Sequence, residues 1–203
     1  MQAKLRYITL FLFLFYNIAD AQAPIRPLEL AFTAMEKEEW DRDFLLAKKD
    51  GNLGHSLILW HYLREGLGRP DQALNFLESN SDWPGLPYLR KQSEKTFLNA
   101  PDEQILAFFD TVKPQTGLGS LIYAKALKRN GQKVKAGLVA QSAWADQSMD
   151  KSTTRDIFEN FRTNLLPLIN NRFEFLLWEK YKASFNSMSF LLDDTQKAVA
   201  DTV

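Results

Sequence analysis

Short helical patterns, separated by glycine and proline turns, fill the sequence from residue 28 onward and leave almost no strand alternation. In residues 54–66, for example, Leu57 and Trp60 belong to an apolar pattern at helical spacing, and Gly66 ends it. Segments this short are marginal alone and must pack their apolar faces on neighbours. The sequence therefore predicts an all-α fold of about ten to twelve short helices without a sheet.

A weak internal repeat indicates how these helices pair. Three segments share the order helix, short turn, helix: residues 62–77, 126–140 and 176–192. In the first two, a glycine ends the first helix (Gly66, Gly131). An alanine on the second helix (Ala73, Ala136) then lets the two backbones approach closely. The third copy is degraded, with Lys180 in place of the glycine. The repeat predicts a right-handed superhelical array of helical hairpins, a TPR-like α-solenoid; a compact helical bundle is the alternative.

The stretch SDWPGLPYLRKQ at 81–92 interrupts the helical pattern with two prolines and a glycine. Pro84 and Pro87 lack amide donors and push the preceding residue out of the α region, whereas Gly85 permits a positive φ. We therefore expect a rigid corner, with Pro87 in the first turn of the next helix and Trp83 packed across both neighbouring helices. Four tryptophans are predicted to be largely buried between hairpins: Trp40, Trp60, Trp83 and Trp144.

The N-terminus has the pattern of a secretory signal peptide. Lys4 and Arg6 precede an apolar run at 8–16, and small residues at 19–23 fit a cleavage site. The apolar run is too short for a membrane span, although an uncleaved N-terminal anchor is the alternative. We therefore expect a signal peptide at 1–21.

Beyond that peptide, a linker at 22–27 and a helical-repeat domain at 28–203 are predicted. The charge is balanced, with 25 basic and 25 acidic residues, which argues against nucleic acid as a partner. Cysteine is absent, so neither disulfides nor a lipoprotein anchor are expected. Because no second long apolar stretch follows, no membrane association is expected after removal of the signal peptide.

Several segments resemble consecutive pieces of one protein family. Two loops carry most of the likeness: Asp82-Trp83-Pro84-Gly85, followed by Pro87, and Pro114-Gln115-Thr116-Gly117. The segments, in chain order, are LILWHYLREG, SDWPGLPYLRKQSEK, VKPQTGLGSLIYAKALKRNG and FEFLLWEKY. They resemble the N-terminal half of soluble lytic murein transglycosylases, particularly the alphaproteobacterial type, over residues 31–194.

This resemblance implies a superhelical, curved or ring-like array that precedes a lysozyme-like catalytic domain. Such enzymes cleave the MurNAc–GlcNAc bond of peptidoglycan in the periplasm and leave a 1,6-anhydro sugar. A periplasmic location agrees with the predicted signal peptide. Because the sequence ends at Val203, we expect the catalytic domain to be absent and the chain alone to be inactive, so its status as an enzyme is left open.

The catalytic acid of the family lies in a Glu-Ser-x-aromatic motif, followed by a glycine-rich loop. Glu78-Ser79 matches only its first two positions, because Ser81 stands where an aromatic residue belongs and no such loop follows. A solvated helix end is therefore expected at Glu78. The sequence predicts no catalytic residue.

Metal and cofactor sites are not predicted either. His55 and His61 lie six positions apart, about 240° around a helix, so they do not share a face. Glu36, Glu38 and Glu39 are expected to open a helix, where acids favour the dipole.

Two further patterns also receive structural interpretations. Gly117-x-Gly119 lacks the preceding strand that a nucleotide loop requires. Six aromatic residues are expected in the core rather than on a sugar-binding platform: Phe108, Phe109, Tyr123, Trp144, Phe173 and Phe175.

Three hypotheses for function remain open at this point. The first is a periplasmic scaffold of the lytic transglycosylase type that positions peptidoglycan or a partner without cleaving it. The second is an enzyme completed by a separate catalytic chain. The third is an unrelated helical-repeat adaptor that binds a protein or peptide in its groove.

Overall fold

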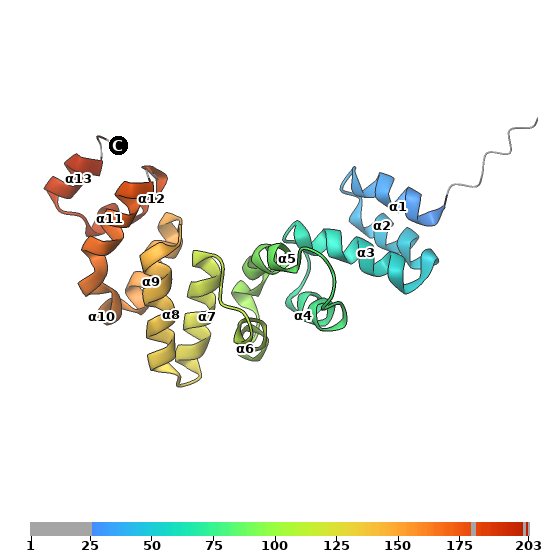
Figure 1. The fold of residues 1–203 in the computed structure, drawn as a ribbon, viewed down its shortest axis with the longest axis horizontal. Coiled ribbons are helices and arrows are strands. Elements are labelled where there is room, and N and C mark those ends of the chain that lie inside the picture. The colour runs from blue at the N-terminus through green and yellow to red at the C-terminus, as the bar shows by residue number, and fades with distance from the viewer. Residues whose placement is uncertain (1–25, 180–181, 201, 203) are drawn as a thin grey trace, which may run out of the picture.

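The computed structural model describes residues 26–179, 182–200 and 202. All regular secondary structure in these ranges is helical and no strand occurs in them, which confirms the all-α prediction. The helices follow one another along the long axis and form an elongated, curved row (Figure 1).

The helices have the following bounds. The first half contains α1 (Pro27–Met35), α2 (Trp40–Ala47), α3 (Gly51–Arg64), α4 (Pro70–Ser79), α5 (Leu86–Ser93) and α6 (Asp102–Asp110). The second half contains α7 (Gly117–Arg129), α8 (Lys133–Asp146), α9 (Lys151–Asn160), α10 (Arg162–Leu165), α11 (Ile169–Glu179), α12 (Lys182–Met188) and α13 (Asp194–Ala200). Short 3₁₀ segments extend some of them: η1 (Lys48–Asp50), η2 (Glu94–Asn99), η3 (Leu166–Leu168) and η4 (Ser189–Leu191).

The predicted signal peptide at 1–21 lies outside the described residues. So does most of the predicted linker at 22–27, and the first helix already begins at Pro27. Lys180, the position at which the third repeat departs from the pattern, also lies outside them.

Local contacts dominate the packing. The main helix contacts join elements no more than three helices apart, such as α1 with α2, α7 with α8, and α9 with α12. The buried apolar side chains of the described residues form three separate clusters rather than one central core. Ile169 packs against both the largest and the C-terminal cluster, so these two clusters adjoin.

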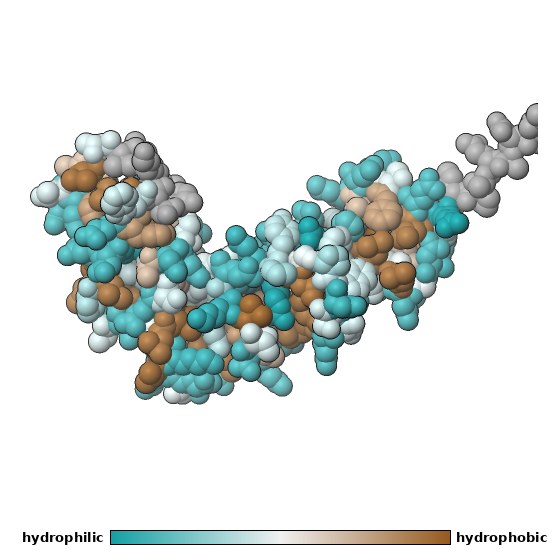
Figure 2. All heavy atoms as spheres, in the orientation of Figure 1, coloured by the Kyte–Doolittle hydropathy of each residue, from teal (hydrophilic) through white to brown (hydrophobic). Residues whose placement is uncertain are grey.

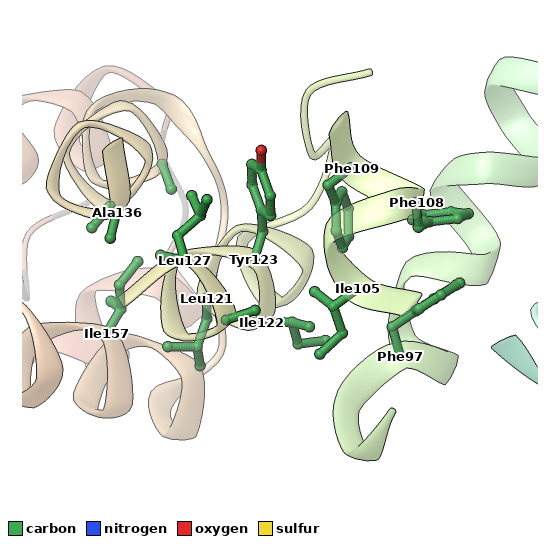
Figure 3. Close-up of a cluster of buried hydrophobic side chains, with 14 of the residues drawn as sticks. Phe97, Ile105, Phe108, Phe109, Leu121, Ile122, Tyr123, Leu127, Ala136 and Ile157 are labelled. Atoms are coloured by element: carbon green, nitrogen blue, oxygen red, sulfur yellow. The ribbon is translucent and has the colours of Figure 1, made fainter. Parts of the chain in front are cut away.

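The largest cluster lies in the middle of the row, from α3 to α10. Figure 3 shows its centre, where Phe97 and Phe108 stack with ring centroids 4.1 Å apart and Ile105 approaches α7. Smaller clusters lie at the two ends. Ala31, Ala47 and Ile58 form the N-terminal cluster. Phe173, Leu176, Phe185, Met188, Leu192 and Ala200 form the C-terminal cluster.

The turn glycines and inner alanines of the first two repeat copies lie as expected. Gly66 (φ +69°) and Gly131 (φ +78°) follow the ends of α3 and α7 in the left-handed region, where a side chain would strain the backbone. Ala73 and Ala136 are both fully buried. Two helix pairs are therefore joined in the predicted way.

The corner at 81–92 has the predicted backbone. Gly85 adopts φ +69°, and Pro87 lies in the first turn of α5. Trp83 contacts Trp60 on α3 and Phe76 on α4, with ring centroids 6.3 and 5.4 Å apart respectively. The corner is therefore a joint between consecutive helix pairs.

The prediction that four tryptophans are largely buried is correct only in part. Trp144 is fully buried, and its indole nitrogen donates to the carbonyl of Leu168 (3.2 Å). Trp40, Trp60 and Trp83 are only half-buried, so the prediction of largely buried rings is wrong for them. Each ring packs on neighbouring helices with one side and remains accessible to water on another, because few helices surround it.

Candidate binding groove

A buried carboxylate fixes the start of α7, on which the candidate site is built. Glu94 accepts hydrogen bonds from the backbone nitrogens of Gln115 (2.6 Å) and Thr116 (2.9 Å), and also from the Thr116 hydroxyl. Thr116 in turn caps α7 by accepting from the Gly119 nitrogen (3.0 Å). Burial raises the pKa of Glu94, although these donors oppose that shift. Glu94 therefore fixes the loop before α7 through hydrogen bonds.

Gln147 closes the same end of the site. Its side-chain oxygen accepts from the Ser120 hydroxyl (2.7 Å), and its amide nitrogen donates to the Pro114 carbonyl (3.2 Å). Behind it, the buried Arg172 donates through one guanidinium nitrogen to the carbonyls of Trp144 (3.0 Å) and Gln147 (2.7 Å). Burial lowers the pKa of Arg172 to about 10. The end of α8 is thus tied to both α7 and α11.

Between α6 and α8 lies a groove whose floor is α7; we call it the α6–α8 groove. Its main cavity has a volume of about 660 Å³. A second cavity of about 200 Å³ adjoins it and shares Asp110, Tyr123 and Lys135. The floor residues of the main cavity are Ser120 and Tyr123. Figure 3 shows Tyr123 pointing away from Leu121 and Ile122, with its hydroxyl at the outer end.

The α8 wall of the groove is a complete helical stripe. It consists of Lys135, Leu138, Val139, Ser142 and Asp146, at the spacing of one helix face. Leu138 is 61 % exposed, and Val134 one turn earlier is also exposed. Figure 2 shows hydrophobic surface over α8. Aliphatic side chains therefore line this wall.

Charges of both signs lie at the groove. The Lys135 ammonium lies 4.0 Å from the Asp110 carboxylate, across from it on α6. A hydrogen bond to Tyr123 raises the pKa of Lys135, and Asp110 adds to that shift. Lys113 and Asp146 line the main cavity as well. The groove is therefore polar at its edges but carries no net charge.

The residues considered as sites from sequence lie elsewhere. Glu78 is exposed on α4, as expected for a solvated helix end. His55 packs on Phe44 (centroids 5.5 Å apart), whereas His61 packs on Phe32 (5.9 Å) and Trp60 (4.8 Å). Burial lowers the pKa of His61. Over the described part of the chain, no three His, Asp or Glu side chains are arranged to hold a metal ion.

The expectation that Glu36, Glu38 and Glu39 open a helix is wrong for Glu36 and Glu38. The acidic cluster forms the turn between α1 and α2, with Glu38 at φ +59° in the left-handed region. Glu36 and Glu38 line a separate cavity of about 530 Å³ with Trp40 and His61. The expected dipole role holds only for Glu39, directly before α2.

The aromatic residues expected in the core are found there, with one partial exception. Phe108, Phe109, Tyr123, Trp144 and Phe173 are buried, and Phe175 is partly buried. Phe109 and Tyr123 touch the groove but are only 3 and 4 % exposed. Gly117 and Gly119 begin α7 at its capped end, not a phosphate loop after a strand.

Sequence reasoning missed the α6–α8 groove. The signal was present in KVKAGLVAQSAWAD, where aliphatic residues occupy two faces of one helix. Ala136 and Ala140 mark the buried face, and Val134 and Leu138 therefore had to lie on another. Only the position of α6 shows that this second face borders a cavity.

Comparison with protein family models, curated proteins and solved structures found no match to this chain. None of the helices in the described ranges has the length and apolar character needed to cross a membrane.

Proposed function

We propose that the chain is a non-catalytic scaffold of the lytic transglycosylase type, which acts in the periplasm by binding peptidoglycan. In this proposal the helices form a right-handed superhelical array of TPR-like hairpins, and a predicted signal peptide directs export. The mature chain would present surfaces rather than perform chemistry. Cleavage of the MurNAc–GlcNAc bond would belong to a separate catalytic domain.

The contact between the two loops that carry the family resemblance is the observation that supports this proposal best. The Gln115 side chain donates to the carbonyl of Pro87 (3.0 Å), and Glu94, just beyond α5, accepts from the Gln115 and Thr116 nitrogens. The motifs thus act on each other as joints of the helical row. Loops that serve as joints suit a family in which this half is architectural.

Peptidoglycan binding and cleavage can be tested together. Purified mature chain should sediment with insoluble peptidoglycan and release no 1,6-anhydromuropeptides, as followed by mass spectrometry. A Glu78→Gln variant serves as the matched control, and we expect it to behave like the parent chain because Glu78 is exposed. Anhydro products that vanish with Glu78→Gln would overturn the scaffold proposal, as would a complete lack of sedimentation.

One observation favours an unrelated helical-repeat adaptor as the second candidate. The α6–α8 groove has an aliphatic wall that is exposed among the described residues. An adaptor would use such a wall for a protein partner, with no requirement for glycan. The sedimentation assay separates the two functions, because only the scaffold proposal requires retention on peptidoglycan.

A further inference from the structure

We propose that the α6–α8 groove binds an amphipathic helix of a partner protein, through aliphatic side chains that pack on Leu138 and Val139. This inference rests on the chain acting by binding, and it names the class of partner that the groove takes. The argument has three parts: the chemistry of the exposed surface, the shape of the walls and the distribution of charge.

The exposed apolar surface of the groove is aliphatic. Sugar rings pack on exposed aromatic faces, but Phe109 and Tyr123 are only 3 and 4 % exposed, so their faces are already occupied. They contact each other, with ring centroids 5.2 Å apart. Leu138, in contrast, is 61 % exposed. Aliphatic side chains of a polypeptide complement this surface better than a glycan does.

The shape of the groove suits a helix. Two helices, α6 and α8, form its sides, and a third, α7, forms its floor. The α8 stripe from Lys135 to Asp146 extends about 17 Å, or three turns. An incoming helix with apolar residues at i, i+3, i+4 and i+7 would match this stripe ridge against groove.

The acidic and basic side chains at the groove favour a partner that carries both basic and acidic residues. At one end Lys135 and Asp110 form a long, exposed ion pair (4.0 Å). Lys113 and Asp146 are not paired with each other or with any other described residue in an ion pair. Asp146 does act on the buried Arg172, whose pKa it raises, but its exposed side chain can still meet a basic group of a partner, and Lys113 can meet an acidic one. A phosphate-rich or strongly anionic ligand would meet Asp110 and Asp146 unfavourably.

The test begins with selection of binders from a displayed library of random peptides of about 16 residues, long enough for the three-turn stripe. We expect enriched peptides to carry aliphatic residues at i, i+3 and i+4, and their affinity is then measured by fluorescence anisotropy. Leu138→Asp should weaken binding about tenfold or more, as loss of a central apolar contact does. Failure to enrich any peptide, or enrichment of an i, i+2 pattern, would overturn the helix proposal.

Leu166→Asp is the matched control, because Leu166 is 53 % exposed but lies on η3, outside the groove. It should leave peptide affinity within about twofold. Equal losses in the two variants would contradict the groove assignment. Soluble chitooligosaccharide forms the second arm: binding that Leu138→Asp abolishes would assign the groove to glycan instead. Peptidoglycan sedimentation of Leu138→Asp is measured separately, so a failed groove leaves the scaffold function independently testable.

Discussion

The N-terminal helices α1–α3 and the central helices α4–α9 each bury one carboxylate, with opposite outcomes. Glu94 in the central region accepts from two backbone nitrogens and one hydroxyl. Asp43 on α2 is also fully buried, yet neither of its oxygens has a hydrogen-bond partner among the described residues. Burial raises the pKa of both groups, but only Glu94 receives compensation for its lost hydration.

This difference extends to the apolar cores. Around Glu94 the cluster includes many aromatic and aliphatic side chains from α3 to α10. Around Asp43 the buried members are Ala31, Ala47 and Ile58, which are few and mostly small. Because local stability follows buried contacts, we expect the N-terminal helices to open more readily than the central ones. The comparison teaches that a buried carboxylate of this chain is compensated where backbone and hydroxyl donors reach it, as at Glu94, and not where they are lacking, as at Asp43.

The largest effect should come from the central core. Trp144→Ala removes a fully buried ring and its hydrogen bond to Leu168, so it should cost about 3–5 kcal/mol of unfolding free energy. Trp40→Ala, at a half-buried ring on α2, should cost clearly less. Urea denaturation of both variants measures the difference. Equal losses would show that the N-terminal helices are as tightly packed as the centre.

Loss of the satisfied carboxylate should have the next largest effect. Glu94→Ala removes the buried acceptor of the Gln115 and Thr116 backbone nitrogens, at the half-buried start of α7, which should cost about 1–3 kcal/mol. Hydrogen exchange should speed up at the Gln115 and Thr116 amides while α1–α3 stay unchanged. Thr96→Ala is the control, because its hydroxyl donates only to Ser93 within the same turn (2.8 Å). Unchanged exchange in Glu94→Ala would contradict the role assigned to Glu94.

Local backbone features of this fold could be predicted from sequence, whereas the burial of individual side chains could not. The positive φ of Gly85 and the place of Pro87 follow from the chemistry of those residues alone. The half-exposure of Trp83 depends on how much of its ring α3 and α4 cover, and this is a property of the assembled helices.

The groove escaped prediction for the same reason. The repeat places Ala136 on the inner face of α8, but only the position of α6 shows that the face with Leu138 borders a cavity. Similarly, nothing in the residues around Glu94 indicates that the loop at 114–116 will provide its donors, because the partners are more than 20 positions apart. Long-range contacts decide both outcomes.

The smallest effect should have the opposite sign. Asp43→Asn removes a buried charge without changing side-chain size, so it should stabilise the chain at neutral pH by about 1 kcal/mol. The Asp43 pKa is raised in the folded state, mainly by burial and further by Glu39, so the folded chain holds this proton more tightly than the unfolded chain. Its contribution to stability is therefore greatest below the ordinary aspartate pKa and falls as pH rises toward the raised value.

The difference between Asp43→Asn and the parent should accordingly be small in acid and grow as pH rises through that window. Urea denaturation at a series of pH values measures it. Glu94 gives the same direction of pH dependence in both proteins, so it cancels in the difference. Asp41→Asn, on the exposed side of α2, is the matched control and should show little change. A stability gain that is the same at every pH would mean that Asp43 carries no buried charge, and the contrast between the two regions would then rest on apolar packing alone.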